Sequence, residues 1–210
     1  MSSLADDCNS ALTLKEQIWR AFRDHERLAL AGGDRLDELV KSTLAAHKIE
    51  CISVDLIGLQ SVLDLCTRMI DEISRYVSQQ SVFSRTFVPR IRGVRRGVRQ
   101  ISQLVRECSQ EDSFVNSGAG THVMLRLLDH IEALSRHAPL AVCFGEFEEI
   151  RKRLTRSEAD YVLGILRSRI QRQADVAYFF TGSDILSLSA LFVAYSEPFF
   201  GGAIVITVEP

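Results

Sequence analysis

A continuous apolar run, Leu140-Ala-Val-Cys-Phe144, is followed at once by Gly145 and the acidic segment Glu146-Phe-Glu-Glu149. The run does not alternate between apolar and polar residues. It therefore predicts a strand buried on both faces, as in a parallel sheet with helices above and below. Open α/β sheets bind ligands beyond the carboxyl ends of their strands. The carboxylates that follow the run are candidate site residues, and a buried strand with a solvated turn is the alternative.

The rest of the chain alternates between the helical and the extended pattern. Strands are predicted at residues 27–31, 49–56, 176–180 and 203–208, and apolar residues recur at helical spacing between them. This alternation predicts a largely parallel sheet between two helix layers, joined by right-handed crossovers. We expect a frayed tail over residues 1–10 and one domain over residues 11–210, because 210 residues suit a single core.

Composition excludes several classes of protein. The chain is 46% hydrophobic and 25% charged, which is ordinary globular usage, and its net charge of -2 predicts no global attraction to nucleic acid or anionic membrane. No apolar run approaches 18 residues, so no membrane helix is expected, and the polar start predicts no signal peptide. The five widely spaced cysteines include no CxxC pair, which favours reduced thiols and a cytoplasmic location. No histidine or cysteine spacing predicts a metal site.

An arginine-rich stretch occupies the middle of the chain, with no Asp or Glu between Glu72 and Glu107. Because Pro89, Gly93 and Gly97 argue against one continuous helix, residues 79–121 are predicted to form an irregular insert. Five of its side chains could contact phosphates: Arg90, Arg92, Arg95, Arg96 and Arg99. Binding of nucleic acid or of an acidic partner, and a solvated or internally paired face, both remain open here. Aromatic residues are too few for a platform that stacks single-stranded bases.

With its elements in this order, the chain resembles the P-loop ATPase domain of the archaeal-type AAA+/STAND ATPases. The matching pieces, in order, are Ile52-Ser-Val-Asp-Leu56, Gly145-Glu-Phe-Glu-Glu149, Phe180-Thr-Gly-Ser-Asp184 and Pro198-Phe-Phe-Gly-Gly202. The resemblance covers about residues 11–210. It implies a three-layer αβα P-loop NTPase-like fold whose strands lie in the order last, first, fourth, third, second. Family members usually continue into a helical lid and a winged helix. This chain stops at Pro210, so neither module is expected in it.

The resemblance also implies roles for individual residues. Gly32 and Gly33 would begin the phosphate-binding loop, Glu146 would be the general base, and Thr181 with Ser183 would form the polar sensor of the γ-phosphate. A working loop needs GxxxxGK[ST], whose backbone N–H groups and lysine hold the phosphates. Aligned from Gly32, the second glycine, the lysine and the hydroxyl residue fall on Asp37, Glu38 and Leu39. Carboxylates at about 4 Å from phosphate would be repelled by about 1 to 4 kcal/mol.

Two further features complete the comparison. Lys41-Ser42 is the dipeptide that a P-loop requires, but it lies about two turns into the following helix, without a glycine before it. Gly145 stands where the family has its magnesium-associated acid, so Glu146 would be a base without a metal.

The sequence therefore predicts a degenerate, non-hydrolysing ATPase-like domain that needs no cofactor or metal. It would act as a structural or regulatory module beside a protein partner or a homologous ATPase subunit. Two alternatives stay open. One is an active ATPase that uses ATP and Mg²⁺ with Glu146, Lys41 and Ser42. The other is a nucleic-acid-associated protein that works through the arginines of residues 85–106.

Overall fold

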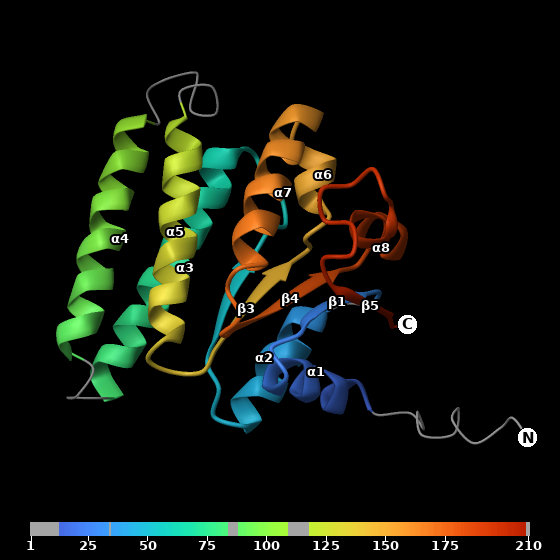
Figure 1. Ribbon diagram of the computed structural model, residues 1–210, viewed down its shortest axis with the longest axis horizontal. Helices are drawn as coiled ribbons and strands as arrows, with labels where there is room; N and C mark the ends of the chain where they lie inside the picture. The colour runs from blue at the N-terminus through green and yellow to red at the C-terminus, as the bar shows by residue number, and fades with distance from the viewer. Residues whose placement is uncertain (1–12, 34, 84–87, 109–117, 209–210) are drawn as a thin grey trace, which may run out of the picture.

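Five strands form one parallel sheet in the order β2-β3-β4-β1-β5 (Figure 1). The computed structural model describes residues 13–33, 35–83, 88–108 and 118–208, with the backbone alone at 80–83, 88–91 and 108. The strands are β1 (Arg27–Ala31), β2 (Cys51–Asp55), β3 (Leu140–Gly145), β4 (Val176–Gly182) and β5 (Ile204–Thr207). The predicted α/β class and the predicted strand order are both confirmed. The tail predicted for residues 1–10 lies outside the described residues.

Helices cover both faces of this sheet (Figure 1). One layer holds α1 (Leu14–Arg23) and α2 (Leu36–Ala46). The other holds α3 (Val62–Phe83), α5 (Ala119–Ser135), α7 (Arg156–Ile170) and α8 (Ile185–Val193), with the short α6 (Glu149–Arg153) after β3. α4 (Val88–Cys108) packs on α3 and α5, on the side away from the sheet. No helix in the described part of the chain is both long and apolar enough to span a bilayer.

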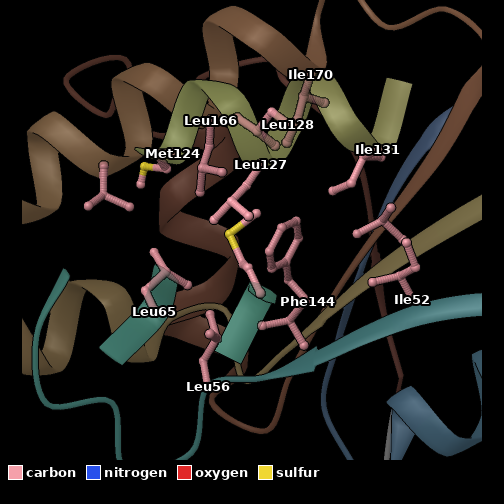
Figure 2. Packing of buried hydrophobic residues seen from close by; sticks show 14 of the residues in the cluster. Ile52, Leu56, Leu65, Met124, Leu127, Leu128, Ile131, Phe144, Leu166 and Ile170 are labelled. Atoms are coloured by element: carbon pink, nitrogen blue, oxygen red, sulfur yellow. The ribbon is translucent and has the colours of Figure 1, made fainter. Parts of the chain in front are cut away.

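The central strands explain why their sequence is apolar without a break. Every residue of β3 and β4 is buried, because successive side chains of a strand point to opposite faces and both faces are covered. Ala141 and Cys143 pack with α1 and α2, whereas Val142 and Phe144 belong to the larger core under α3, α5 and α7. Figure 2 shows Phe144 in that core, close to Leu127 of α5.

The irregular insert predicted for residues 79–121 is wrong where the structure describes it. α3 runs on to Phe83, and residues 88–108 form one helix of 21 residues. Pro89 lies in the first turn of α4, where a missing N–H costs nothing. Val94, Val98, Ile101 and Val105 share the buried face, at helical spacing.

Gly97 lies within α4 without breaking it, because it packs against α5. The helix approaches α5 so closely there that a Cβ atom at Gly97 would lie 2.4 Å from Nε2 of His130. Gly97 is therefore a helix-packing residue, since only a residue without a side chain permits this separation. Gly93 has no atom within 4 Å of its own Cβ position, so the helix tolerates it on the open side.

Candidate functional site

A cleft of about 450 Å³ lies at the carboxyl edge of the sheet. Parallel strands end at the same edge, so the loops that follow four different strands meet there. The cleft is lined by Arg35, Asp37, Asp55, Ile57, Gly145, Glu146, Glu149, Arg153, Thr181 and Ser183. Three of the residues predicted from the sequence are brought together in this lining, namely Glu146, Thr181 and Ser183. Gly32, Gly33, Lys41 and Ser42 are not among the lining residues.

Glu146 points across the edge of the sheet, from the end of β3 to the end of β4. Its Oε2 accepts hydrogen bonds from the backbone N–H of Ser183 at 3.2 Å and from the Ser183 hydroxyl at 2.7 Å. The backbone of Glu146 is left-handed, with φ of 50°, which is costly for a residue with a side chain. Strained residues of this kind persist where the surroundings fix them, and they cluster at functional sites.

Phe147 holds the Glu146 turn in place. Its ring is fully buried, 4.7 Å from the ring of Phe180 and 5.4 Å from that of Phe199 between centroids. Its N–H donates to the carbonyl of Thr181 at 2.9 Å. With Phe147 anchored in the core and its backbone tied to β4, the flanking residues have little freedom to move. Glu146 is directed to the cleft by this anchor.

The loop after β1 is short. Gly32 has φ of 120°, and a Cβ atom there would lie 2.1 Å from the carbonyl oxygen of Val208. Gly32 therefore allows the backbone that follows β5 to pack directly against the loop after β1. Arg35 is the N-cap residue of α2, in the left-handed region, and makes no side-chain cap hydrogen bond. The helix begins at Leu36, so the second half of the aligned window 32–39 is already helical.

Two carboxylates occupy the first turn of α2. Asp37 and Glu38 lie at the positive end of the helix dipole, which favours negative side chains. Asp37 lines the cleft at the position where a P-loop has its second glycine. Asp37 therefore brings a carboxylate to the corner of the cleft next to β1, where Arg35 is the neighbouring cation.

Lys41 and Ser42 are engaged within α2. Nζ of Lys41 lies 3.2 Å from the Asp37 carboxylate and also donates to Glu38. Burial alone would lower the pKa of Lys41, but its hydrogen bonds to Glu38 and Asp37 outweigh that effect and raise the pKa. The hydroxyl of Ser42 donates to the carbonyl of Leu39 at 3.1 Å. Lys41 and Ser42 therefore make these contacts within α2. The Lys41 ammonium does not line the cleft, and it contacts the lining residue Asp37.

Gly145 is the position at which the resemblance predicts the loss of an acid, and the structure leaves room there for a side chain. A Cβ atom at this position would lie 3.8 Å from Cβ of Asp37, 3.8 Å from Cα of Asp55 and 3.9 Å from Oγ1 of Thr181. These are ordinary van der Waals distances, so the fold does not require glycine here. A carboxylate at this position would face the acids Asp37 and Asp55.

Glu148 is a buried carboxyl group to which the sequence assigned no role beyond its place in the acidic segment after β3. Its side chain is fully buried, and Oε1 accepts the N–H of Asp184 at 2.9 Å. Nζ of Lys152 lies 3.6 Å away, but Oε2 has no partner among the described residues. Burial raises the pKa of Glu148. A Cβ atom at Gly182 would lie 2.0 Å from Oε2, so this carboxyl fills the space that Gly182 leaves.

The remaining charges of the cleft are mixed. Arg153 forms an ion pair with Glu149 at 2.8 Å, and Asp55 accepts the N–H of Ile57 at 2.9 Å. Arg35 has no ion pair with any described residue. The part of the chain that the structure describes contains no group of three or more His, Cys, Asp or Glu residues that could hold a metal ion. No sequence pattern indicated Arg35 or Arg153 as site residues, because the position of Arg35 depends on its left-handed backbone and that of Arg153 on the short α6.

The predicted phosphate-contacting arginines lie elsewhere, on α4. Arg92, Arg96 and Arg99 are exposed, and Arg95 is half-buried. The side chain of Arg90 lies outside the described residues. None of them lines the cleft, so they form a separate candidate surface.

Comparisons with known proteins bear on the fold. No protein-family model matches the chain, and no curated protein matches its sequence significantly. Among solved structures, a Walker-type ATPase of Pyrococcus abyssi superposes with a TM-score of 0.59 at 14% sequence identity. The match covers 93% of this chain and 52% of that ATPase, so the chain spans about half its length. This likeness supports a P-loop ATPase-like fold, and at such an identity it shows the fold alone.

Proposed function

We propose that this chain is an ATPase-like domain that does not hydrolyse ATP and that acts as a regulatory or structural module. The observation that carries the proposal is the β1–α2 corner of the cleft. There the carboxylate of Asp37 faces the space where a nucleotide's phosphates would lie, and the nearby ammonium of Lys41 is held by Asp37 and Glu38. Catalysis of phosphoryl transfer depends on positioning and on positive groups that neutralise the negative phosphates. At this corner a negative carboxylate stands where such a positive group is needed.

The residues present do not fit Mg²⁺-ATP. A phosphate about 4 Å from Asp37 would be repelled by about 1 to 4 kcal/mol, depending on the local dielectric. Gly145 offers no side-chain oxygen to a metal, and Glu146 is already bonded to Ser183. We therefore expect no nucleotide cofactor for this domain.

An active ATPase with an irregular loop remains the alternative, and one observation favours it. Arg35 stands at the start of α2 and, among the described residues that line the cleft, makes no ion pair. A guanidinium can bind phosphate with two parallel hydrogen bonds. Under this alternative Arg35 would replace the missing lysine.

The apolar surface of α8 supports the role as an interaction module. Ile185–Val193 contains no charged residue, although Leu186 is 83% exposed and Val193 is 63% exposed. These two side chains lie seven residues apart, on one face of the helix. Tyr195, at 88% exposure, extends the surface beyond the helix. A helix that is apolar on all sides is normally covered, and we infer that a homologous ATPase-like subunit covers this one.

A thermal-shift titration tests the absence of nucleotide binding. We expect 1 mM ATP with Mg²⁺ to raise the unfolding midpoint by no more than Mg²⁺ alone. Tight binding would stabilise the fold by RT ln(1 + [L]/Kd), which is about 2.7 kcal/mol at 100 times Kd. For a chain of this size that corresponds to a rise of roughly 5 to 11 °C. Such a rise, lost in Arg35→Ala and kept in the exposed control Arg23→Ala, would establish the active alternative instead.

Light scattering tests the apolar surface. If a second ATPase-like copy covers α8, the molar mass should rise with protein concentration. Leu186→Ser with Val193→Ser should abolish that rise, because it removes the apolar area without disturbing the buried face. A wild-type chain that stays monomeric at high concentration would contradict a partner that is a second copy of this chain.

A further inference from the structure

We propose that α4 binds the phosphate backbone of a nucleic-acid duplex. The outer face of the helix carries Arg92, Arg96, Arg99 and Arg106, which we call the arginine stripe. Their spacing of four, three and seven residues places them on one side of an α-helix with 3.6 residues per turn. At a rise of about 1.5 Å per residue, the stripe is roughly 21 Å long. The arginine stripe is separate from the cleft. Its role does not depend on the function proposed above for the cleft.

Burial fixes the direction in which the stripe points. Val94, Val98, Ile101 and Val105 fill the opposite face of α4 and pack against α3 and α5. The helix cannot rotate the arginines inward without exposing this apolar row. α4 itself lies along the edge of the molecule (Figure 1), so the face opposite its buried row is turned outward.

Three arginines of the stripe make no ion pair with the described residues, namely Arg92, Arg96 and Arg99. No Asp or Glu occurs between Glu72 and Glu107. Arg106 donates to the carbonyl of Ser102 at 3.2 Å. A chain with a net charge of -2 thus concentrates positive charge on one helix.

The chemistry of the stripe favours a polyanion over a protein or a membrane. Over residues 92–107, no large apolar side chain is exposed. Protein interfaces need apolar or aromatic anchors at their centre, and membrane-surface helices need a free apolar face. The apolar face of α4 is already buried in the domain. Aromatic side chains for stacking single-stranded bases are also lacking on the described outer face.

The dimensions of α4 match a duplex. An α-helix is about 10–12 Å wide with its side chains, and the major groove of B-DNA is about 12 Å wide. A duplex carries one negative charge per about 1.7 Å, so the length of the stripe faces about twelve phosphate charges. A hollow of about 630 Å³ borders the stripe and is lined by Arg99, Gln103, Arg106 and Glu107. Contacts to the backbone alone predict binding without sequence preference.

Fluorescence anisotropy with a labelled 20-base-pair DNA duplex tests the proposal between 50 and 200 mM NaCl. Three or four phosphate contacts predict that affinity falls about 40- to 150-fold over this range. Arg92→Ala with Arg96→Ala and Arg99→Ala should flatten the slope of log K against log salt by about 2.7. It should also weaken binding at 50 mM NaCl at least about tenfold. Lysine at the same three positions should retain the slope, because it retains the charges.

The matched control removes three exposed cations from α1, on the other face of the sheet. Lys15→Ala with Arg20→Ala and Arg23→Ala changes the net charge equally. We expect this variant to bind the duplex as the wild type does. An equal loss in both variants would attribute binding to net charge and would overturn the proposal. Circular dichroism and the unfolding midpoint confirm that each variant is folded.

Four further probes decide the class of partner. The proposal expects an RNA duplex to bind in the same range, and it expects a single strand, a polyglutamate peptide and vesicles of anionic lipid to bind at least about tenfold more weakly. Polyglutamate or vesicles bound as tightly as the duplex would assign the stripe to an acidic protein or a membrane. A wild-type affinity that is independent of salt would refute phosphate binding altogether.

Discussion

The carboxylate of Glu146 is bonded twice to Ser183, by the backbone N–H at 3.2 Å and by the hydroxyl at 2.7 Å. The bonds join the carboxyl ends of β3 and β4, which are neighbours in the sheet. The resemblance noted in the sequence would make Glu146 the general base and Ser183 part of the γ-phosphate sensor, and both roles stay predictions. Here each satisfies the other without a ligand, so the pair acts as a structural clasp across the edge of the sheet.

This clasp predicts an unusual order of stability at position 146. Glu146→Ala should lower the free energy of unfolding by about 1–3 kcal/mol, because it removes two hydrogen bonds to a charged acceptor. Glu146→Gly loses the same bonds but relieves the left-handed φ of 50°. We expect the glycine variant to be about 1 kcal/mol more stable than the alanine variant. Urea unfolding measures both, and an alanine variant at least as stable as the glycine variant would show that the backbone is relaxed there.

The two central glycines of α4 predict opposite responses to the same substitution. Gly97→Ala should destabilise the fold by about 1–3 kcal/mol, because its Cβ would collide with His130. Gly93→Ala should stabilise it by about 0.5–1 kcal/mol, because alanine is the better helix former and the position is open. Thermal or urea unfolding decides the point.

A double variant checks the cause of the Gly97 effect. His130→Ala should recover much of the stability lost in Gly97→Ala, because it empties the space that the new methyl group needs. If the two losses simply add, the contact between α4 and α5 is looser than the structure shows.

The buried Glu148 predicts a dependence of stability on pH. Burial raises its pKa above the ordinary 4.5, so the folded chain holds this proton at pH values where the unfolded chain has lost it. Its contribution to stability is complete below pH 4.5 and is lost as the pH rises through the raised pKa. Glu148→Gln keeps the size and polarity but cannot ionise.

The measurement compares unfolding free energies of wild type and Glu148→Gln from pH 4 to pH 8. We expect the free energy of unfolding of Glu148→Gln to increase relative to that of the wild type as the pH rises above about 4.5. The gain should then level off once the carboxyl is ionised in both states. A difference that stays constant across this range would mean that Lys152 and the N–H of Asp184 hold the carboxylate ionised despite its burial.

Some of the site could be predicted from the sequence because it depends on local pattern. The unbroken run Leu140–Phe144 identified a strand covered on both faces, and the strand-end residues Glu146, Thr181 and Ser183 were expected at one edge. The positions of Asp37 and Glu38, in place of glycine and lysine, also follow from alignment alone. Whether this combination binds no nucleotide stays a prediction.

Contacts between residues that are distant along the chain could not be predicted from the sequence. The local pattern at Gly97 predicts a helix break, because nothing in it shows that His130, 33 positions later, lies against this glycine. The acids Glu146, Glu148 and Glu149 look equivalent in sequence, but their environments differ. Glu146 accepts hydrogen bonds from Ser183, Glu148 is buried, and Glu149 forms an ion pair with Arg153.

The parallel α/β architecture and the residues at each strand end could be read from the sequence, because strands buried on two faces are unbroken apolar runs that are visible locally. Only the folded chain shows that Glu146 is bonded to Ser183 and that Gly97 packs against His130. Both contacts join elements that are distant along the chain, and a local periodic pattern carries no record of them.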